Sequence, residues 1–196
     1  MQTLRGWKVT VNAPAVLGFA LACVAARLLG IVTGGLATRL LFMVYRSSPL
    51  DPLAWVRLAG HVLGHADWSH LLHNMMMLLL LGPMLEEKYG TKRILLMMLA
   101  VAVTTGCVSV LLFPHTALMG ASGIVFAMIL LAPITQREEH TIPLSFVLVA
   151  VLYIGEQVAQ GIFTRDQVAQ SAHIVGGLVG AALGFMMSRP GGAGRA

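Results

Sequence analysis

The chain has 196 residues, of which 57% are hydrophobic and 11% are charged, whereas about 25% of the residues in soluble domains are charged. This composition, with a mean hydropathy of +0.81, excludes an ordinary soluble protein and indicates a membrane protein with several spans. The formal net charge of +5 does not indicate a nucleic-acid partner, because the basic residues lie mostly in short loops and tails beside apolar runs, where they set topology.

The first predicted span covers residues 13–29 and follows two basic residues, Arg5 and Lys8. Residues 31–67 have a different pattern, in which short amphipathic pieces alternate with glycines, prolines and aromatic or basic residues. Such pieces are typical of the membrane interface. We therefore expect a transmembrane helix followed by a long segment that lies on or partly in the membrane.

Five more apolar segments complete a predicted six-helix, all-α membrane protein. The segment that begins at Ser122 is too short to cross a hydrocarbon core of about 30 Å by itself. We expect this helix to start inside the protein with its first turn facing a cavity, because irregular backbone at membrane depth needs shielding. The five segments cover residues 68–85, 94–113, 122–134, 142–158 and 168–187.

The positions of lysine and arginine predict the orientation. The amino terminus, the polar turns at 86–93 and 135–140, and the carboxyl-terminal tail hold eight of the thirteen basic residues. Because cytoplasmic loops carry an excess of basic residues, both termini are expected to be cytoplasmic, in the plasma membrane of the cell. Residues 1–188 are expected to form one membrane domain, and residues 189–196 a disordered tail.

Two polar groups inside these segments are candidates for catalysis, because polar side chains are costly in lipid and are functional by default. Ser122 lies in the stretch Gly120-Ala121-Ser122-Gly123, at the outer end of the short helix, and His173 is a lone imidazole in the last segment. At 100° per residue, Gly180 falls within about 20° of His173, and Gly176 flanks this line. We expect this glycine groove to pack against the short helix, which would bring the hydroxyl and the imidazole together as an activated nucleophile.

A second pair of polar residues lies on the 68–85 segment. His70 and Asn74 are four residues apart, so they share one face of the helix within about 40°. One helix face therefore presents two hydrogen-bond donors. The histidines His61, His65 and His73 are expected to serve packing, with hydrogen bonds to the backbone.

These motifs resemble the rhomboid intramembrane serine proteases, and the resemblance covers nearly all of residues 55–184. It extends over five ordered motifs, which rarely arise together by chance. They are Arg57 with His61 and His65, the segment 68–74, the exit of that helix at 85–90, the Gly120-Ala121-Ser122-Gly123 box, and residues 172–176 with Gly180.

The resemblance implies a catalytic dyad in which Ser122 is the nucleophile and His173 is the general base. It assigns stabilisation of the oxyanion to His70 and Asn74, together with the backbone N–H of Ser122. Asp166 and Glu156 are the only acids near the outer ends of the last two helices. Whether either carboxylate assists His173 stays open at this point.

The resemblance also implies supporting roles for five residues around the dyad. Phe126 stands where the family usually has a tyrosine packed against the catalytic imidazole, so the ring is kept and the hydroxyl is lost. A second departure is Trp55-Val56-Arg57, where the family commonly has tryptophan directly before arginine. The other supporting residues are Gly120, Gly123, Gly176 and Gly180.

The implied substrates are membrane proteins whose transmembrane helix is weakened by glycine, proline or polar residues, with the lipid bilayer as the setting. No metal and no organic cofactor are implied. Two alternatives stay open: an inactive rhomboid-like protein that binds transmembrane helices without cutting them, and a haem or metal protein. In the second alternative the ligands would be His61, His65, His70 and His73.

Overall fold

The computed structural model describes most of the chain up to residue 135 and parts of the remainder. The catalytic candidate His173, the acids Glu156 and Asp166 and the predicted tail at 189–196 lie outside the described residues. The described residues are 10–135, 144, 147–148, 151–152, 155, 174–180, 182–183 and 186.

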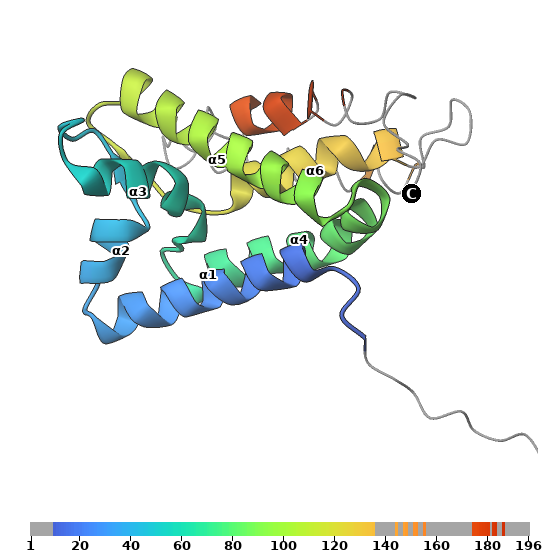
Figure 1. Cartoon of the computed structure of the whole chain (residues 1–196), viewed down its shortest axis with the longest axis horizontal. Helices are drawn as coiled ribbons and strands as arrows, with labels where there is room; N and C mark the ends of the chain where they lie inside the picture. The colour runs from blue at the N-terminus through green and yellow to red at the C-terminus, as the bar shows by residue number, and fades with distance from the viewer. Residues whose placement is uncertain are drawn as a thin grey trace, which may run out of the picture.

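The described part is a helical bundle with a small two-stranded sheet. Helix α4 contacts α1, α5 and α6, and it lies alongside α1 in Figure 1. The elements are α1 (Pro14–Val32), α2 (Leu36–Leu41), β1 (Val44–Tyr45), α3 (Pro52–Gly60), the 3-10 helix η1 (His61–Leu63), α4 (Trp68–Tyr89), α5 (Thr91–Leu112), β2 (Ala117–Leu118) and α6 (Ser122–Thr135).

The predicted spans agree with these helices, with one correction. The polar stretch 86–93 is not a turn, because α4 continues to Tyr89 and α5 begins at Thr91. Glutamate and lysine are good helix formers, so their charge does not end a helix. The break falls instead at Gly90, whose φ of 82° favours glycine.

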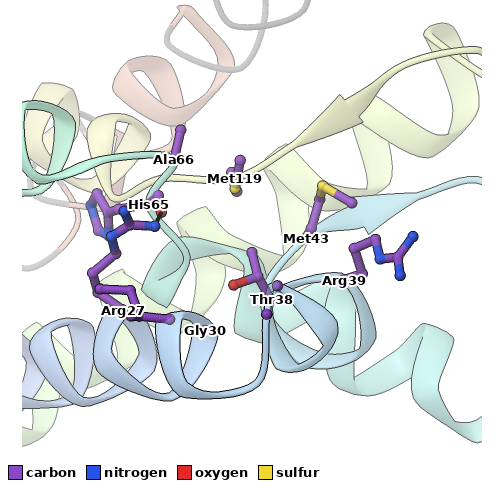
Figure 2. A pocket seen from close by; sticks show the side chains of 11 residues that line it. Arg27, Gly30, Thr38, Arg39, Met43, His65, Ala66 and Met119 are labelled. Carbon is purple, nitrogen blue, oxygen red and sulfur yellow. Dashed lines mark hydrogen bonds between the residues drawn. The ribbon is translucent and has the colours of Figure 1, made fainter.

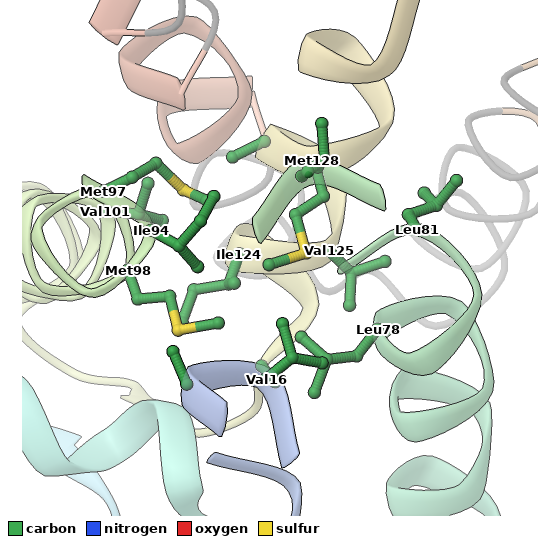
Figure 3. Close-up of a cluster of buried hydrophobic side chains, with 14 of the residues drawn as sticks. Val16, Leu78, Leu81, Ile94, Met97, Met98, Val101, Ile124, Val125 and Met128 are labelled. Carbon is green, nitrogen blue, oxygen red and sulfur yellow. The ribbon is translucent and has the colours of Figure 1, made fainter. Parts of the chain in front are cut away.

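Two of the described helices, α1 and α5, are long and apolar enough to cross a membrane. The described residues of the predicted fifth and sixth segments, 142–158 and 168–187, are helical as well. The count of six spans stays a prediction. A shared apolar core joins α1, α4, α5 and α6, in which Val16, Leu78, Met98 and Ile124 are buried (Figure 3).

The prediction of short pieces for the segment between α1 and α4 is confirmed, since α2, α3 and η1 are all short. The sequence did not indicate the sheet, in which β1 pairs antiparallel with β2 through Val44 and Leu118. Strands of two residues are too short to have a hydrophobic periodicity. This pairing joins the segment between α1 and α4 to the chain just before Ser122.

A buried arginine organises the interfacial segment. Arg57 is 1% exposed, and its Nη2 donates to the carboxylate of Asp51 and to the hydroxyl of Ser47, both at 2.7 Å. The guanidinium also lies 4.5 Å from the ring centroid of Tyr45. The hydrogen bond from Arg57 lowers the pKa of Asp51, whose carboxylate also caps α3 by accepting from the Leu53 N–H at 3.0 Å.

A second buried charge joins the start of α1 to the end of α4. The carboxylate of Glu86 accepts hydrogen bonds from the N–H groups of Ala15 and Val16, both at 2.9 Å, and from the Thr91 hydroxyl at 2.7 Å. The first N–H groups of a helix have no partner within the helix, and a negative charge there is favourable. Glu86 therefore connects the start of α1 to the end of α4 and to the start of α5.

His61 connects η1 to α5 through its imidazole and to the loop before α6 through its backbone carbonyl. Its Nδ1 lies 3.1 Å from the carbonyl oxygen of Leu58, and its Nε2 lies 3.3 Å from the Thr105 hydroxyl. The backbone carbonyl of His61 accepts from the Gly120 N–H at 3.0 Å. Burial lowers the pKa of His61 to about 4, so the imidazole is neutral at physiological pH.

Replacing Glu86 with alanine is expected to lower the free energy of unfolding by about 3 kcal/mol, because two buried N–H groups lose a charged acceptor. Thermal unfolding in detergent measures this loss. Glu87→Ala is the matched control, since Glu87 is the exposed neighbour on the same helix. Equal melting temperatures for the two variants would contradict the bracing role.

The stability of the protein is expected to fall as the pH decreases from about 6.5 to about 4. The unfolded chain binds a proton at His61 in this range and the folded chain does not, so protonation favours unfolding by up to about 1.4 kcal/mol per pH unit. Denaturation in detergent at several pH values measures the slope. His61→Gln should reduce the slope and His115→Gln, at an exposed position, should keep it; the same slope in all three proteins would refute the assignment.

Candidate active site

The loop before α6 makes a close backbone approach to α4 at Gly120. Its φ of +131° is a conformation that residues with a side chain rarely adopt. A Cβ atom at Gly120 would lie 2.8 Å from Nε2 of His70 and 3.7 Å from Oγ of Ser122. The absence of a side chain at Gly120 therefore lets the imidazole of His70 and the hydroxyl of Ser122 border the same small space.

Ser122 is the first residue of α6 and is partly exposed. The loop that leads to it is held by the hydrogen bond from Gly120 to the carbonyl of His61 and by the β1–β2 pair. Helix N-termini present N–H groups without intrahelical partners and favour negative charge. The Ser122 hydroxyl therefore lies beside backbone N–H groups that can donate hydrogen bonds to an oxyanion as it forms.

His70 lies in the first turn of α4 and is half-buried. Its backbone N–H donates to the carboxylate of Asp67, the N-cap residue, at 2.8 Å. Its ring meets the ring of His65 edge-on, with centroids 5.0 Å apart and an interplanar angle of 69°. The cap fixes the start of α4, and the ring contact packs the His70 imidazole against His65.

His65 is buried behind His70, with 1% of its surface exposed. Its Nδ1 lies 3.2 Å from the carbonyl oxygen of Leu63. Burial is the main cause that lowers its pKa to about 4, so this ring is neutral at physiological pH. The expectation that His61 and His65 pack with hydrogen bonds to the backbone is thus confirmed.

Asn74 lies one turn after His70 on α4 and is 2% exposed. Its Nδ2 is buried and has no hydrogen-bond partner among the residues that the structure describes. Leaving a buried amide donor unpaired costs about 1 to 3 kcal/mol. The amide of Asn74 is therefore free to donate a hydrogen bond to an acceptor on another molecule.

The last predicted span packs on α6 next to Ser122, in agreement with the predicted glycine groove. A Cβ atom at Gly176 would lie 2.9 Å from the carbonyl oxygen of Gly123. Gly177 lies against the ring of Phe126, and Gly180 against Ala127. Figure 1 shows residues 174–180 in red beside α6. The helical residues 174–180 therefore pack against the first turns of α6.

The arrangement of the histidine side chains bears on the alternative of a histidine-based metal site. His65 and His70 lie edge-on to each other, whereas Nδ1 of His61 is turned to a backbone carbonyl. Among the described residues, no group of three or more histidine, cysteine, aspartate or glutamate side chains is placed to hold a metal ion.

The chain is similar in sequence to known proteins. The chain is 28% identical over 193 residues to the rhomboid protease GlpG of Yersinia pseudotuberculosis, with 96% of this chain and 66% of the relative covered. It is 27% identical over 150 residues to rhomboid-like protein 11, chloroplastic, of Arabidopsis thaliana, with 69% of this chain and 54% of the relative covered. The chain thus spans about half to two thirds of the length of these relatives.

The sequence model described as the Rhomboid domain matches residues 52–190. The matched part includes η1, the whole of α4, α5 and α6, and the described residues of the last span. The matched part therefore includes every candidate catalytic, oxyanion-stabilising and supporting residue. The chain belongs to the rhomboid family.

Proposed function

We propose that this integral membrane protein is an intramembrane serine endopeptidase, which hydrolyses a peptide bond in or near a transmembrane segment of another protein. The observation that carries the proposal is the shared space at Gly120, which the imidazole of His70 and the hydroxyl of Ser122 both border. Family membership and the protease named among its relatives support the same reaction.

In the proposed reaction, Ser122 Oγ attacks the substrate carbonyl while His173 removes the hydroxyl proton. The tetrahedral intermediate then collapses, the C–N bond breaks, and His173 gives the proton to the leaving amine. Water hydrolyses the acyl-enzyme with the same imidazole as base. The packing of Gly176 on Gly123 supports this pairing, because it sets the residues that follow His173 in the sequence against the start of α6.

The proposed oxyanion site uses His70, Asn74 and the N–H of Ser122. Its support is the position of the His70 ring at Gly120 and the buried, unpaired amide of Asn74. Donors that are already aimed at the developing charge need no reorganisation during the reaction. The glycines Gly120, Gly123, Gly176 and Gly180 serve the close approach of backbones around the site.

The ring of Phe126 is proposed to support the orientation of His173. It lies against Gly177, which follows His173 by four residues in the sequence. Because residues four apart share one face of a helix, the ring is proposed to limit the rotamers of the His173 side chain. No carboxylate is needed for this role, so a dyad without Asp166 or Glu156 is the simpler mechanism.

The proposed substrates are membrane proteins with transmembrane helices weakened by glycine, proline or polar residues, because a helix must unwind before its carbonyl can be attacked. We place the protein in the plasma membrane with both termini in the cytoplasm, from the distribution of basic residues. An inactive binder of transmembrane helices has less support, since it needs neither a nucleophile nor a base.

Ser122→Ala and His173→Ala are each expected to lower the cleavage of a helix-weakened model substrate by at least about 10³-fold, because each removes one half of the dyad. Cleavage by the full chain in detergent micelles measures this loss. Ser48→Ala is the control, since Ser48 is exposed in the interfacial segment. Residual cutting near the native rate in either dyad variant would exclude the proposed mechanism.

Asn74→Ala and His70→Ala are each expected to lower kcat by about 10²- to 10³-fold and to change KM less, because an oxyanion donor acts mainly in the transition state. Steady-state kinetics with the same substrate separates kcat from KM. His115→Ala, at an exposed position, should leave both constants unchanged. A rise in KM with an unchanged kcat would assign these residues to substrate binding instead.

A further inference from the structure

A cavity of about 580 Å³ lies between the end of α1, α2 and the loop before α6, and His70 is not among its lining residues. It is separate from the candidate active site, although His65 and Met119 form part of its wall. Figure 2 shows Arg27 beside His65 at one end and Arg39 at the other, with Thr38 between them. The cavity therefore has a basic residue at each end.

The charge of this cavity is not balanced by the described residues that line it. Arg27 and Arg39 both line it, and none of the lining residues is acidic. Asp67 follows the lining residue Ala66 and caps α4 by accepting from the backbone N–H of His70, but it is not a lining residue. Asp51, on the neighbouring α3, is paired with Arg57. The lining of the cavity thus carries two formal positive charges and no carboxylate.

Arg27 has weak partners for a half-buried guanidinium. Its Nη1 lies 3.5 Å from the carbonyl oxygen of His65, and its guanidinium carbon lies 5.9 Å from the ring centroid of Trp68. Its Nε is buried and has no hydrogen-bond partner in the described part of the chain. A charge removed from water without a counter-ion is costly, so an anion in this cavity would stabilise the protein.

The surroundings of the cavity are apolar. Ile31 lines it and is 49% exposed, and Val32 at the end of α1 is 84% exposed. Leu36 and Leu40 of α2 are 50% and 38% exposed beside the same turn. An arginine-lined cavity with such a rim matches a molecule that has an anionic head and apolar tails.

We propose that this cavity binds the phosphate group of an anionic phospholipid. Arg27 contacts the phosphate, the Thr38 hydroxyl donates to it, and Arg39 attracts it from the other end of the cavity. The acyl chains lie along the exposed apolar side chains of α1 and α2. A lipid with net negative charge is favoured over a zwitterionic one, because the cavity has no carboxylate for an ammonium group. This proposal does not depend on the proposed protease activity.

The test is lipid titration of the detergent-purified full chain, followed by native mass spectrometry, with phosphatidylglycerol and phosphatidylcholine of identical acyl chains. The native protein is expected to bind phosphatidylglycerol at least about fivefold more tightly. Arg27→Gln and Arg39→Gln should each weaken that binding by about fivefold, the contribution of one arginine near an anionic lipid. Phosphatidylcholine should lose less affinity than phosphatidylglycerol, because its ammonium group already opposes binding beside the arginines.

Two control variants make the result specific. Arg46→Gln removes the same charge from an exposed position outside the cavity, so it should leave lipid binding unchanged. Arg27→Lys keeps the charge and should retain the preference for phosphatidylglycerol. If Arg27→Gln fails to fold, Arg39→Gln tests the same site, because Arg39 is exposed.

Equal affinity for the two lipids, or equal losses in Arg46→Gln and Arg39→Gln, would overturn the proposal and indicate a general effect of surface charge. A competition with inorganic phosphate separates a lipid site from a site for a free anion. Millimolar phosphate should not displace phosphatidylglycerol, because it lacks the apolar contacts. Displacement at that concentration would assign the cavity to a free anion.

Discussion

Close backbone contacts at glycine determine where the groups of the candidate site lie. The imidazole of His70 reaches the start of α6 because Gly120 has no side chain, and the last span reaches the same place because Gly176 has none. A Cβ atom at either position would require the backbone or the imidazole to shift. Small residues allow such approaches between helices in lipid, where packing drives association. The chemistry therefore depends on residues that take no part in it.

Buried charges hold the frame around these contacts. Glu86 links the ends of α1, α4 and α5, and Arg57 links α3 to the strand β1 through Asp51 and Tyr45. Each charge has a partner, as the low dielectric of an apolar interior requires. His61 adds a neutral connection between η1, α5 and the loop before α6. These polar links hold the elements that surround the glycine contacts.

The sequence predicted the helical part of this arrangement well, because apolar length and glycine spacing are local signals. The start of α6 at Ser122 was expected from the apolar run, and the packing of Gly176 and Gly180 on that helix from the helical spacing of the glycines and the small residues at its start. The helical stretch 86–89 was expected as a turn, since charge at a membrane surface does not show whether the helix has ended. The β1–β2 pair and the cavity at Arg27 depend on contacts between distant segments, which no local pattern records.

The central claim is that Ser122 is an activated nucleophile, and the most direct measurement is mapping of a fluorophosphonate adduct on the full chain. The native protein is treated with the probe in detergent, digested, and its labelled peptide sequenced by mass spectrometry. The account predicts a single adduct on Ser122 that is lost when His173 is replaced. An adduct on another serine, or labelling of Ser122 that does not depend on His173, would contradict it.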